Sequence, residues 1–343
     1  MKTVVLDNGS ACIKLIQVSE SETDRFSTAP NCVARSKDDR KLFIGPELWP
    51  RLQQQPQTMQ FKRAHDRGYL TSWETERLIW DELFRTTGVD DALAANVLLI
   101  LSEPPDNLST LQEMTDHMVF DYFRFDAFVR CPTALLASYG AASALGDLQG
   151  RQREFCLVVD VGFSHTHITP IIDGQVATMH VKRLDIGGKF LTNVLKESIS
   201  FRHYNMMEET LLVEHIKEAC CFVSMEFEKD MERARDGTLK TQYLLPDVAT
   251  NTPGRLVEAE DIAALSEDAQ LLPLTSETFT IPELLFTPSD MSHTQGGVVD
   301  GIVQAIETLP RHIQGLLLAN IIVLGNSSRF KNFEARLERD LQS

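Results

Sequence analysis

The feature that most constrains the fold is a short pattern that occurs twice, near the N-terminus and near the middle of the chain. In each copy an apolar run ends in an aspartate, Asp7 or Asp160, and a turn with a glycine, Gly9 or Gly162, leads into a second strand-forming run. Glycine lets backbone N–H groups face an anion, and an aspartate at a strand end can hold a hydrated divalent cation beside phosphate oxygens. The repetition predicts two related halves that close on one nucleotide.

Length and composition are those of a large soluble globular protein. The chain has 343 residues, of which 43% are hydrophobic, and no apolar run approaches the ~20 residues of a membrane span. The N-terminus enters a strand without a signal-peptide pattern, so we expect an intracellular protein and no membrane partner. The net charge of −16 argues against autonomous DNA binding, which needs clustered Lys and Arg. The six cysteines lack C-x-x-C spacing and are expected to be reduced.

Strands alternate with helical patterns in both halves, which predicts the α/β class with layered sheets. A helix is expected to start at Trp73 and to end before Gly88. A buried helix is expected at residues 135–145, and one long amphipathic helix at residues 208–235. Residues about 250–277 include an acidic run and are expected to form a surface insertion.

Several motifs, in order along nearly the whole chain, resemble those of actin and the actin-related proteins. The matching segments are residues 7–14, 67–80, 101–105, 160–171, 183–188, 216–223, 243–247 and 324–328. The resemblance implies an actin-like (ribonuclease H-like) duplicated fold with two lobes around a nucleotide cleft. It places the first phosphate loop and a short filament-loop region in a first lobe, 1–133. The second phosphate loop, base clamp and adenosine loop fall in a second lobe, 134–343. The family continues beyond the match to Ser343, so the C-terminal part of the first lobe is expected to be missing.

The same resemblance assigns roles in nucleotide binding. It implies that Asp7 and Asp160 orient waters around Mg²⁺, that Ser10 holds the terminal phosphate, that Lys14 reaches the β-phosphate and that His167 faces the attacking water. The whole predicted set is Asp7, Asn8, Gly9, Ser10, Lys14, Asp160, Gly162, His167, Gly188, Lys217, Glu218, Gly325, Asn326, Ser327 and Phe330. The implied cofactor is ATP or ADP with Mg²⁺ in a structural role.

Simpler roles stay open for some of these residues. Lys217 and Glu218 suit ion pairs on a helix surface, and Ser10 and Lys14 suit a turn hydroxyl and a solvated strand lysine. His165 and His167 share one face of a strand, but the sequence supplies no further ligand for a metal site.

Two departures from the family pattern predict the loss of hydrolysis. Phe163 stands where the family has a second aspartate, and Thr133 stands where a glutamine orients the hydrolytic water. A missing carboxylate weakens the hold on the cation, and a hydroxyl cannot position water as the longer amide does. We therefore predict negligible ATP hydrolysis and no catalytic residues.

Within the family, residues 207–210, 221–224 and 281–290 are most similar to the nuclear branch called class six, whose members are subunits of SWR-type histone-exchange chromatin remodellers. This implies a non-catalytic scaffold subunit in the nucleus and also the cytoplasm. The implied partners are the motor subunit, a small zinc-binding companion and, through the complex, histones and the nucleosome. The alternatives are a polymerising, ATP-hydrolysing actin-like protein, and a sugar kinase or chaperone ATPase of the same superfold. Residues 35–45 are shorter than the filament loop of actin, which argues against a homopolymer.

Overall fold

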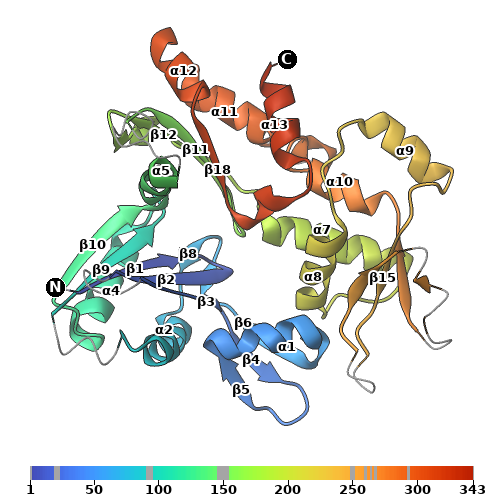
Figure 1. The fold of residues 1–343 in the computed structure, drawn as a ribbon, viewed down its shortest axis with the longest axis horizontal. Helices are drawn as coiled ribbons and strands as arrows, with labels where there is room; N and C mark the ends of the chain where they lie inside the picture. Colours follow the sequence, from blue (N-terminus) through green and yellow to red (C-terminus); the bar gives the residue numbers. More distant parts are fainter. Residues whose placement is uncertain are drawn as a thin grey trace.

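The computed structural model describes residues 2–18, 24–89, 96–144, 154–247, 252–258, 261–262, 265, 269–291 and 294–342. Two mixed sheets form its framework (Figure 1). The first has the order β10-β9-β1-β2-β3, from β1 (Lys2–Asn8), β2 (Cys12–Val18), β3 (Arg25–Pro30), β9 (Val97–Glu103) and β10 (Ala127–Pro132). Strand β1 runs antiparallel to β2 and parallel to β9.

The second sheet repeats this arrangement. Its order is β13-β12-β11-β18, and β14 also pairs with β12. The strands are β11 (Cys156–Val161), β12 (Thr166–Ile172), β13 (Gln175–Val176), β14 (Lys182–Leu184) and β18 (Ile321–Leu324). Strand β11 runs antiparallel to β12 and parallel to β18, as β1 does to β2 and β9. The predicted duplication, with its α/β actin-like fold, is therefore confirmed, because the two aspartate-bearing strands occupy equivalent places in their sheets.

Helices of the first lobe pack an aromatic core against the first sheet. They are α2 (Trp73–Thr87), α4 (Ser109–His117) and the π-helix η3 (Met118–Tyr122). Helix α5 (Thr133–Ala144) instead packs Ala134 against Cys156 and Val158 of the second sheet. Trp80 lies 5.4 Å from Phe123 and 5.6 Å from Phe84 between ring centroids, and all three rings are buried. Helix α2 begins at Trp73 as predicted and ends at Gly88, whose φ of +73° terminates it. Helix α5 begins at the predicted lobe boundary of residue 133, and that boundary stays a prediction.

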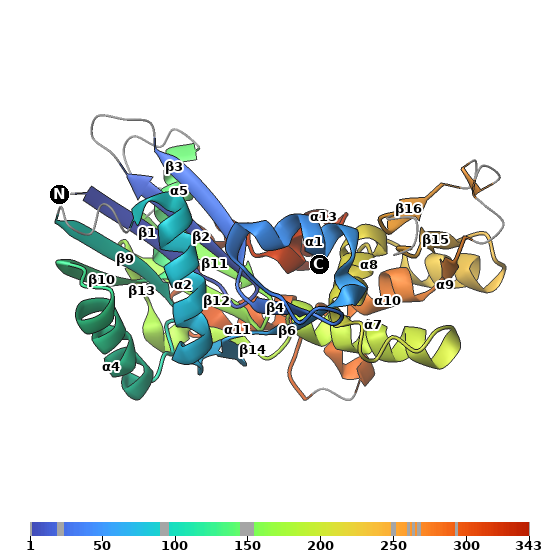
Figure 2. The same ribbon diagram turned by 90° about the horizontal axis from the view of Figure 1, so that it is seen from below.

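A small sheet extends the first lobe. It has the order β5-β4-β6, from β4 (Val33–Ser36), β5 (Leu42–Ile44) and β6 (Met59–Lys62). The short helices η1 (Gly45–Glu47), α1 (Leu48–Gln54) and η2 (Pro56–Thr58) cover it, and the hairpin β7 (His65–Asp66) and β8 (Tyr69–Leu70) follows. Only residues 37–41 connect β4 to β5. In Figure 2 the strands β4 and β6 of the small sheet lie near the middle of the molecule, between α4 at one end and α9 at the other.

The second lobe contains the largest core. Its helices are α7 (Gly188–Arg202), α8 (Thr210–Cys220), α9 (Phe227–Arg235), α10 (Glu277–Glu283), α11 (Val298–Ile306), α12 (Arg311–Leu318) and α13 (Phe333–Gln342). Short 3₁₀ turns are η4 (Thr178–His180), η6 (Pro288–Met291) and η7 (Asn326–Arg329). The guanidinium of Arg336 on α13 makes two hydrogen bonds, of 2.7 and 2.9 Å, to the carboxylate of Glu283 on α10. No helix in the described ranges is long and apolar enough to span a membrane.

Three expectations from the sequence are wrong in detail. The helix predicted at 208–235 is two helices, α8 and α9, because the amides of Phe222 and Val223 bond to the carbonyls of Thr278 and Lys331 instead of continuing α8. Helix α5 is only partly buried, and Tyr139 on it is 49% exposed.

The predicted surface insertion at 250–277 is also not wholly on the surface, and its residues 250–251, 259–260, 263–264 and 266–268 lie outside the described residues. It contains β16 (Arg255–Val257) and β17 (Leu271–Leu274), which flank β15 (Thr241–Leu244) in a three-stranded sheet. Leu272 and Leu274 are fully buried, so the alternating apolar residues of β17 belong to the core of the second lobe.

Candidate nucleotide-binding cleft

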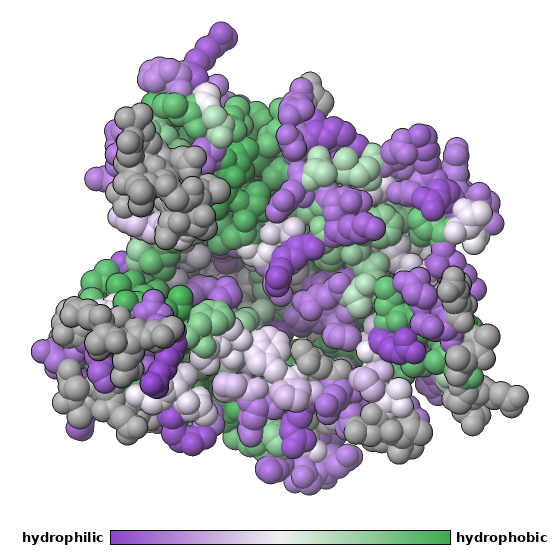
Figure 3. All heavy atoms as spheres, in the orientation of Figure 1, coloured by the Kyte–Doolittle hydropathy of each residue, from purple (hydrophilic) through white to green (hydrophobic). Residues whose placement is uncertain are grey.

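The two predicted phosphate loops face one cavity. The turn after β1 and the turn after β11 both line a cavity of about 440 Å³, with Asp7 and Asp160 at the strand ends. The other predicted residues here are Asn8, Gly9, Ser10, Lys14, Gly162, His167, Gly325 and Asn326. Thr133, at the start of α5, lines the same cavity. The surface is hollowed between the two lobes in Figure 3. The two halves of the repeat therefore meet across one space.

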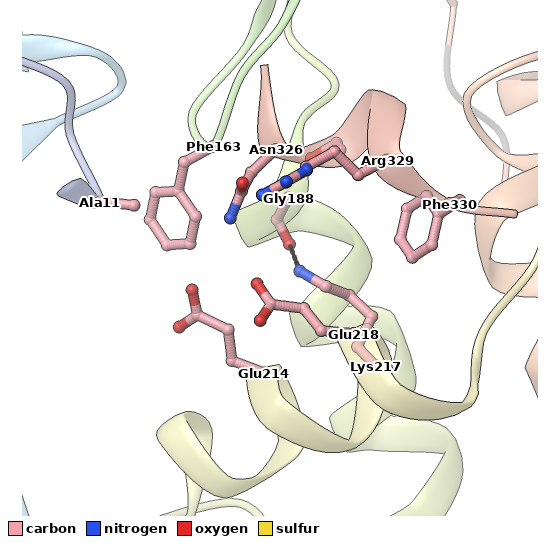
Figure 4. Close-up of a pocket in the computed structure, with 10 residues that line it drawn as sticks. Ala11, Phe163, Gly188, Glu214, Lys217, Glu218, Asn326, Arg329 and Phe330 are labelled. Carbon is pink, nitrogen blue, oxygen red and sulfur yellow. Dashed lines mark hydrogen bonds between the residues drawn. The ribbon is translucent and has the colours of Figure 1, made fainter. Parts of the chain in front are cut away.

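A second, smaller cavity of about 210 Å³ adjoins the first, and Ala11, Phe163, Asn326 and Arg329 line both. The remaining predicted residues line it: Gly188, Lys217, Glu218, Ser327 and Phe330. Figure 4 shows Glu214 and Glu218 extending from α8 toward the side of the pocket that holds Phe163 and Asn326. The structure thus gathers every residue of the predicted set around two neighbouring cavities, and nucleotide binding by them stays a prediction.

The larger cavity places two carboxylates, those of Asp7 and Asp160, near the ammonium group of Lys14. The Lys14 ammonium lies 2.8 Å from a carboxylate oxygen of Asp7, its direct neighbour across the β1–β2 ladder, and the Ser102 hydroxyl donates to the other oxygen at 2.8 Å. Burial, together with the negative charge of Asp7, raises the pKa of Asp160 to about 6. Two carboxylates that share one lysine are a fitting donor set for a hydrated cation beside phosphate groups.

Phe163, where the resemblance to the family predicts a second aspartate, packs its aromatic ring against a cation. The guanidinium carbon of Arg63 lies 4.4 Å from the centroid of the Phe163 ring. The same guanidinium forms an ion pair with Glu214 at 3.1 Å. A phenyl ring offers no oxygen ligand, so Phe163 adds nothing to the shell of a divalent cation.

Lys217 of the predicted base clamp, Lys217 and Glu218, is hydrogen-bonded to another helix of the second lobe. The Lys217 ammonium donates to the carbonyl of Gly188 at 3.1 Å, drawn in Figure 4, and to the hydroxyl of Thr192 at 2.9 Å. Lys217 is buried, and this burial lowers the pKa of its ammonium. Burial and the neighbouring Glu214 raise the pKa of Glu218. Lys217 therefore anchors α8 to α7, whereas Glu218 lines the smaller cavity.

The adenosine-loop residues are placed by close backbone packing. Gly325 has a φ of +95°, and a Cβ there would lie 2.2 Å from the carbonyl oxygen of Val161. The Ser327 hydroxyl donates to the carbonyl of Gly162 at 3.1 Å. The turn after β18 is thus joined to the second phosphate loop, and only glycine suits position 325.

His165 and His167 lie side by side, with ring centroids 4.2 Å apart. Burial, then the neighbouring His167, lowers the pKa of His165 to about 3, so its ring is neutral. His167 Nε2 lies 3.4 Å from a carboxylate oxygen of Asp106. Within the described part of the chain, no three His, Cys, Asp or Glu side chains are grouped as metal ligands.

Sequence reasoning missed three residues of the site. Arg63 and Glu214 meet across the cleft, and Arg329 lines both cavities. Glu214 lies four residues before Glu218 on α8, so the helical period could have placed it on the same face. Arg63 carries no such local signal, because its partners come from distant segments.

The repeated sheet and the cleft between two phosphate loops define a two-lobed protein of the actin fold. The profile of the Actin family matches residues 1–343, and the chain belongs to that family. Proteins of this family generally bind a nucleotide with Mg²⁺.

The relatives narrow the resemblance further. The chain is 36% identical to "Actin-like protein ARP6" of Yarrowia lipolytica, over 99% of the chain and 82% of that protein. It is 33% identical to "Actin-related protein 6" of Drosophila melanogaster and 34% identical to "Actin-related protein 6" of Arabidopsis thaliana, over 99% of the chain and 85% of each relative. The predicted resemblance to class six is confirmed.

Proposed function

We propose that this chain is a non-catalytic scaffold subunit of a nuclear chromatin-remodelling complex that exchanges a histone variant. Similarity to actin-related proteins of class six supports this proposal. The observation that carries its non-catalytic part is the contact of Phe163 with Arg63, where hydrolysing members of the family have a carboxylate.

A structural nucleotide, ATP or ADP with Mg²⁺, fits the cleft. Asp7 and Asp160 would hold the hydrated cation, while Lys14 and the loop of Ser10 would hold phosphate oxygens. When bound, Mg²⁺ would supply positive charge that offsets the negative charge of the phosphates and of the two carboxylates. Binding of nucleotide to the folded state alone stabilises that state by mass action, without turnover.

The same geometry argues against hydrolysis. Phosphoryl transfer depends almost entirely on positioning and electrostatic stabilisation. Thr133 lines the cavity but lacks the amide that orients water, and Phe163 supplies no charge. The chain's own residues would bind and orient the nucleotide and leave its terminal phosphate in place.

The proposed partners are the motor subunit of the remodeller, a small zinc-binding companion and, through the complex, histones and the nucleosome. We place the protein in the nucleus and also in the cytoplasm. With a net charge of −16, contact with DNA is expected through partners rather than through this chain.

Purification of the tagged chain from cells of its own source, followed by mass spectrometry, tests this proposal. Tagged actin from the same cells is the control. We expect a remodeller motor subunit and a histone variant with the chain and not with the control. Recovery of filament proteins alone, or of copies of the chain alone, would contradict the proposal and favour the polymerising alternative.

A further inference from the structure

Arg63 follows β6 in the first lobe and contacts three other segments. Its Nη1 donates to the carbonyl oxygens of Ser10 and Ala11 in the first phosphate loop, at 3.4 and 3.2 Å. Its Nη2 donates to Glu214 on α8 at 3.1 Å. The guanidinium group also lies over the ring of Phe163 in the second phosphate loop, with its carbon 4.4 Å from the ring centroid. One guanidinium therefore joins both phosphate loops and the helix that carries the base clamp.

These contacts are shielded from solvent. The side chains of Arg63 and Glu214 are only 12% and 16% exposed, unlike those of ordinary surface ion pairs. Removing one partner of such a shielded pair leaves the other charge without compensation, so the pair resists separation. The cation–π contact with Phe163 is strengthened by the same exclusion of water.

The start of α8 is held against the first lobe by two further contacts. Leu211 packs into the core of the small sheet, whose other members are Cys32, Ala34, Phe43, Leu48 and Met59. Glu209, just before α8, forms an ion pair with Lys37 at 2.9 Å. The first turns of α8 are thus docked on the small sheet by residues of the chain itself.

The Arg63 contacts lie where the two cavities join. Phe163 and Ala11 line both cavities, and Glu214 lines the smaller one. A ligand that spans both cavities would lie beside these contacts, and the contacts must break before the lobes separate there.

We propose that Arg63, Phe163 and Glu214 form an interlobe clasp that keeps the cleft closed without nucleotide and limits the rate at which nucleotide enters and leaves. Arg63 and Glu214 act as positioning residues, because they hold the loops and α8 rather than touch phosphate. The effect on the rate of nucleotide entry and release rests on the proposed nucleotide binding. The closure of the cleft in the nucleotide-free protein does not depend on that proposal.

The test compares the wild type with Arg63→Ala, Glu214→Gln and Phe163→Leu. Arg51→Ala is the matched control, because Arg51 makes a cation–π contact at 3.9 Å with Phe43 inside the first lobe alone. The first readout is small-angle X-ray scattering of the nucleotide-free protein. The second is release of a fluorescent ATP analogue during a chase with excess ATP.

We expect a larger radius of gyration and at least tenfold faster release for Arg63→Ala and Glu214→Gln, with a smaller increase for Phe163→Leu. Arg51→Ala should match the wild type in both readouts. Unchanged scattering in all three clasp variants would overturn the proposal. If the analogue binds to no variant, nucleotide binding is contradicted, and the scattering alone decides on the clasp.

Discussion

Asp160 and Phe163 are three residues apart, yet they have opposite consequences for the cleft. Asp160 retains a carboxylate whose pKa of about 6 results from burial and from the charge of Asp7. Phe163, where the resemblance to the family predicts a carboxylate, presents an aromatic ring to the guanidinium of Arg63. At this site Asp160 therefore offers a carboxylate to a hydrated cation, whereas the neighbouring position is filled by the ring of Phe163 and the guanidinium of Arg63.

The raised pKa of Asp160 predicts a pH-dependent stability. The folded protein retains a proton that the unfolded chain releases between about pH 4 and 6, so the free energy of unfolding falls as pH rises through that window. Asp160→Asn removes the carboxyl group whose ionisation causes this loss of stability. We expect it to raise the free energy of unfolding by about 2 kcal/mol at pH 7.5 and to change it little at pH 4.

Urea denaturation in buffer free of nucleotide and Mg²⁺ measures this effect. Asp38→Asn, at an exposed site in the turn between β4 and β5, is the control and should show no such pH dependence. An equal effect of Asp160→Asn at both pH values would contradict the predicted pKa.

At the scale of elements, local sequence patterns predicted the helix ends that are set by residues close to them in the sequence. The start of α2 at Trp73 was predicted from a Thr71-x-x-Glu74 capping-box pattern, and its end from the glycine stop at Gly88. Both ends are as predicted, although the N-cap residue is Ser72 and its side chain makes no capping hydrogen bond. The break between α8 and α9 could not be predicted, because residues 222 and 223 bond to partners more than fifty residues away. Continuous amphipathic periodicity across 208–235 gave no sign of those bonds.

Docking of α8 on the small sheet predicts a cost for shortening Leu211, which is 9% exposed. We expect Leu211→Ala to lower the free energy of unfolding by about 2–3 kcal/mol, because it leaves a cavity between α8 and the small sheet. Leu316→Ala on α12 is the matched control, since Leu316 is 46% exposed, and it should change stability by less than about 0.5 kcal/mol. Equal effects of the two variants in urea denaturation would refute the docked position of α8.

At the scale of the whole molecule, the repeated Asp–turn–Gly pattern predicted two related halves, and the resemblance to the actin family supplied the residues that line their shared cavity. Contacts between the lobes were beyond prediction. Arg63 meets Glu214 across 151 positions of sequence, and only the folded arrangement of both lobes brings them together. The buried strand β17 within the predicted surface insertion was missed for a related reason, because its place is fixed by pairing with β15.

The short connection at residues 37–41 predicts that the chain does not form filaments. Actin carries a long loop there that serves filament contacts, and five residues in a tight hairpin cannot replace it. We expect a single monomeric boundary in sedimentation velocity with Mg²⁺, KCl and ATP, at a concentration where actin polymerises. Rapidly sedimenting polymer under these conditions would favour the alternative function.

We infer that the cleft holds an adenine nucleotide without hydrolysing it. The most direct measurement loads the purified protein with ATP labelled at the γ-phosphate in the presence of Mg²⁺, removes free nucleotide, and follows label as bound ATP or released phosphate. Labelled ATP should stay bound and intact over times in which filamentous actin converts its nucleotide to ADP. Release of labelled phosphate at the rate of actin, or the absence of any bound nucleotide, would contradict it.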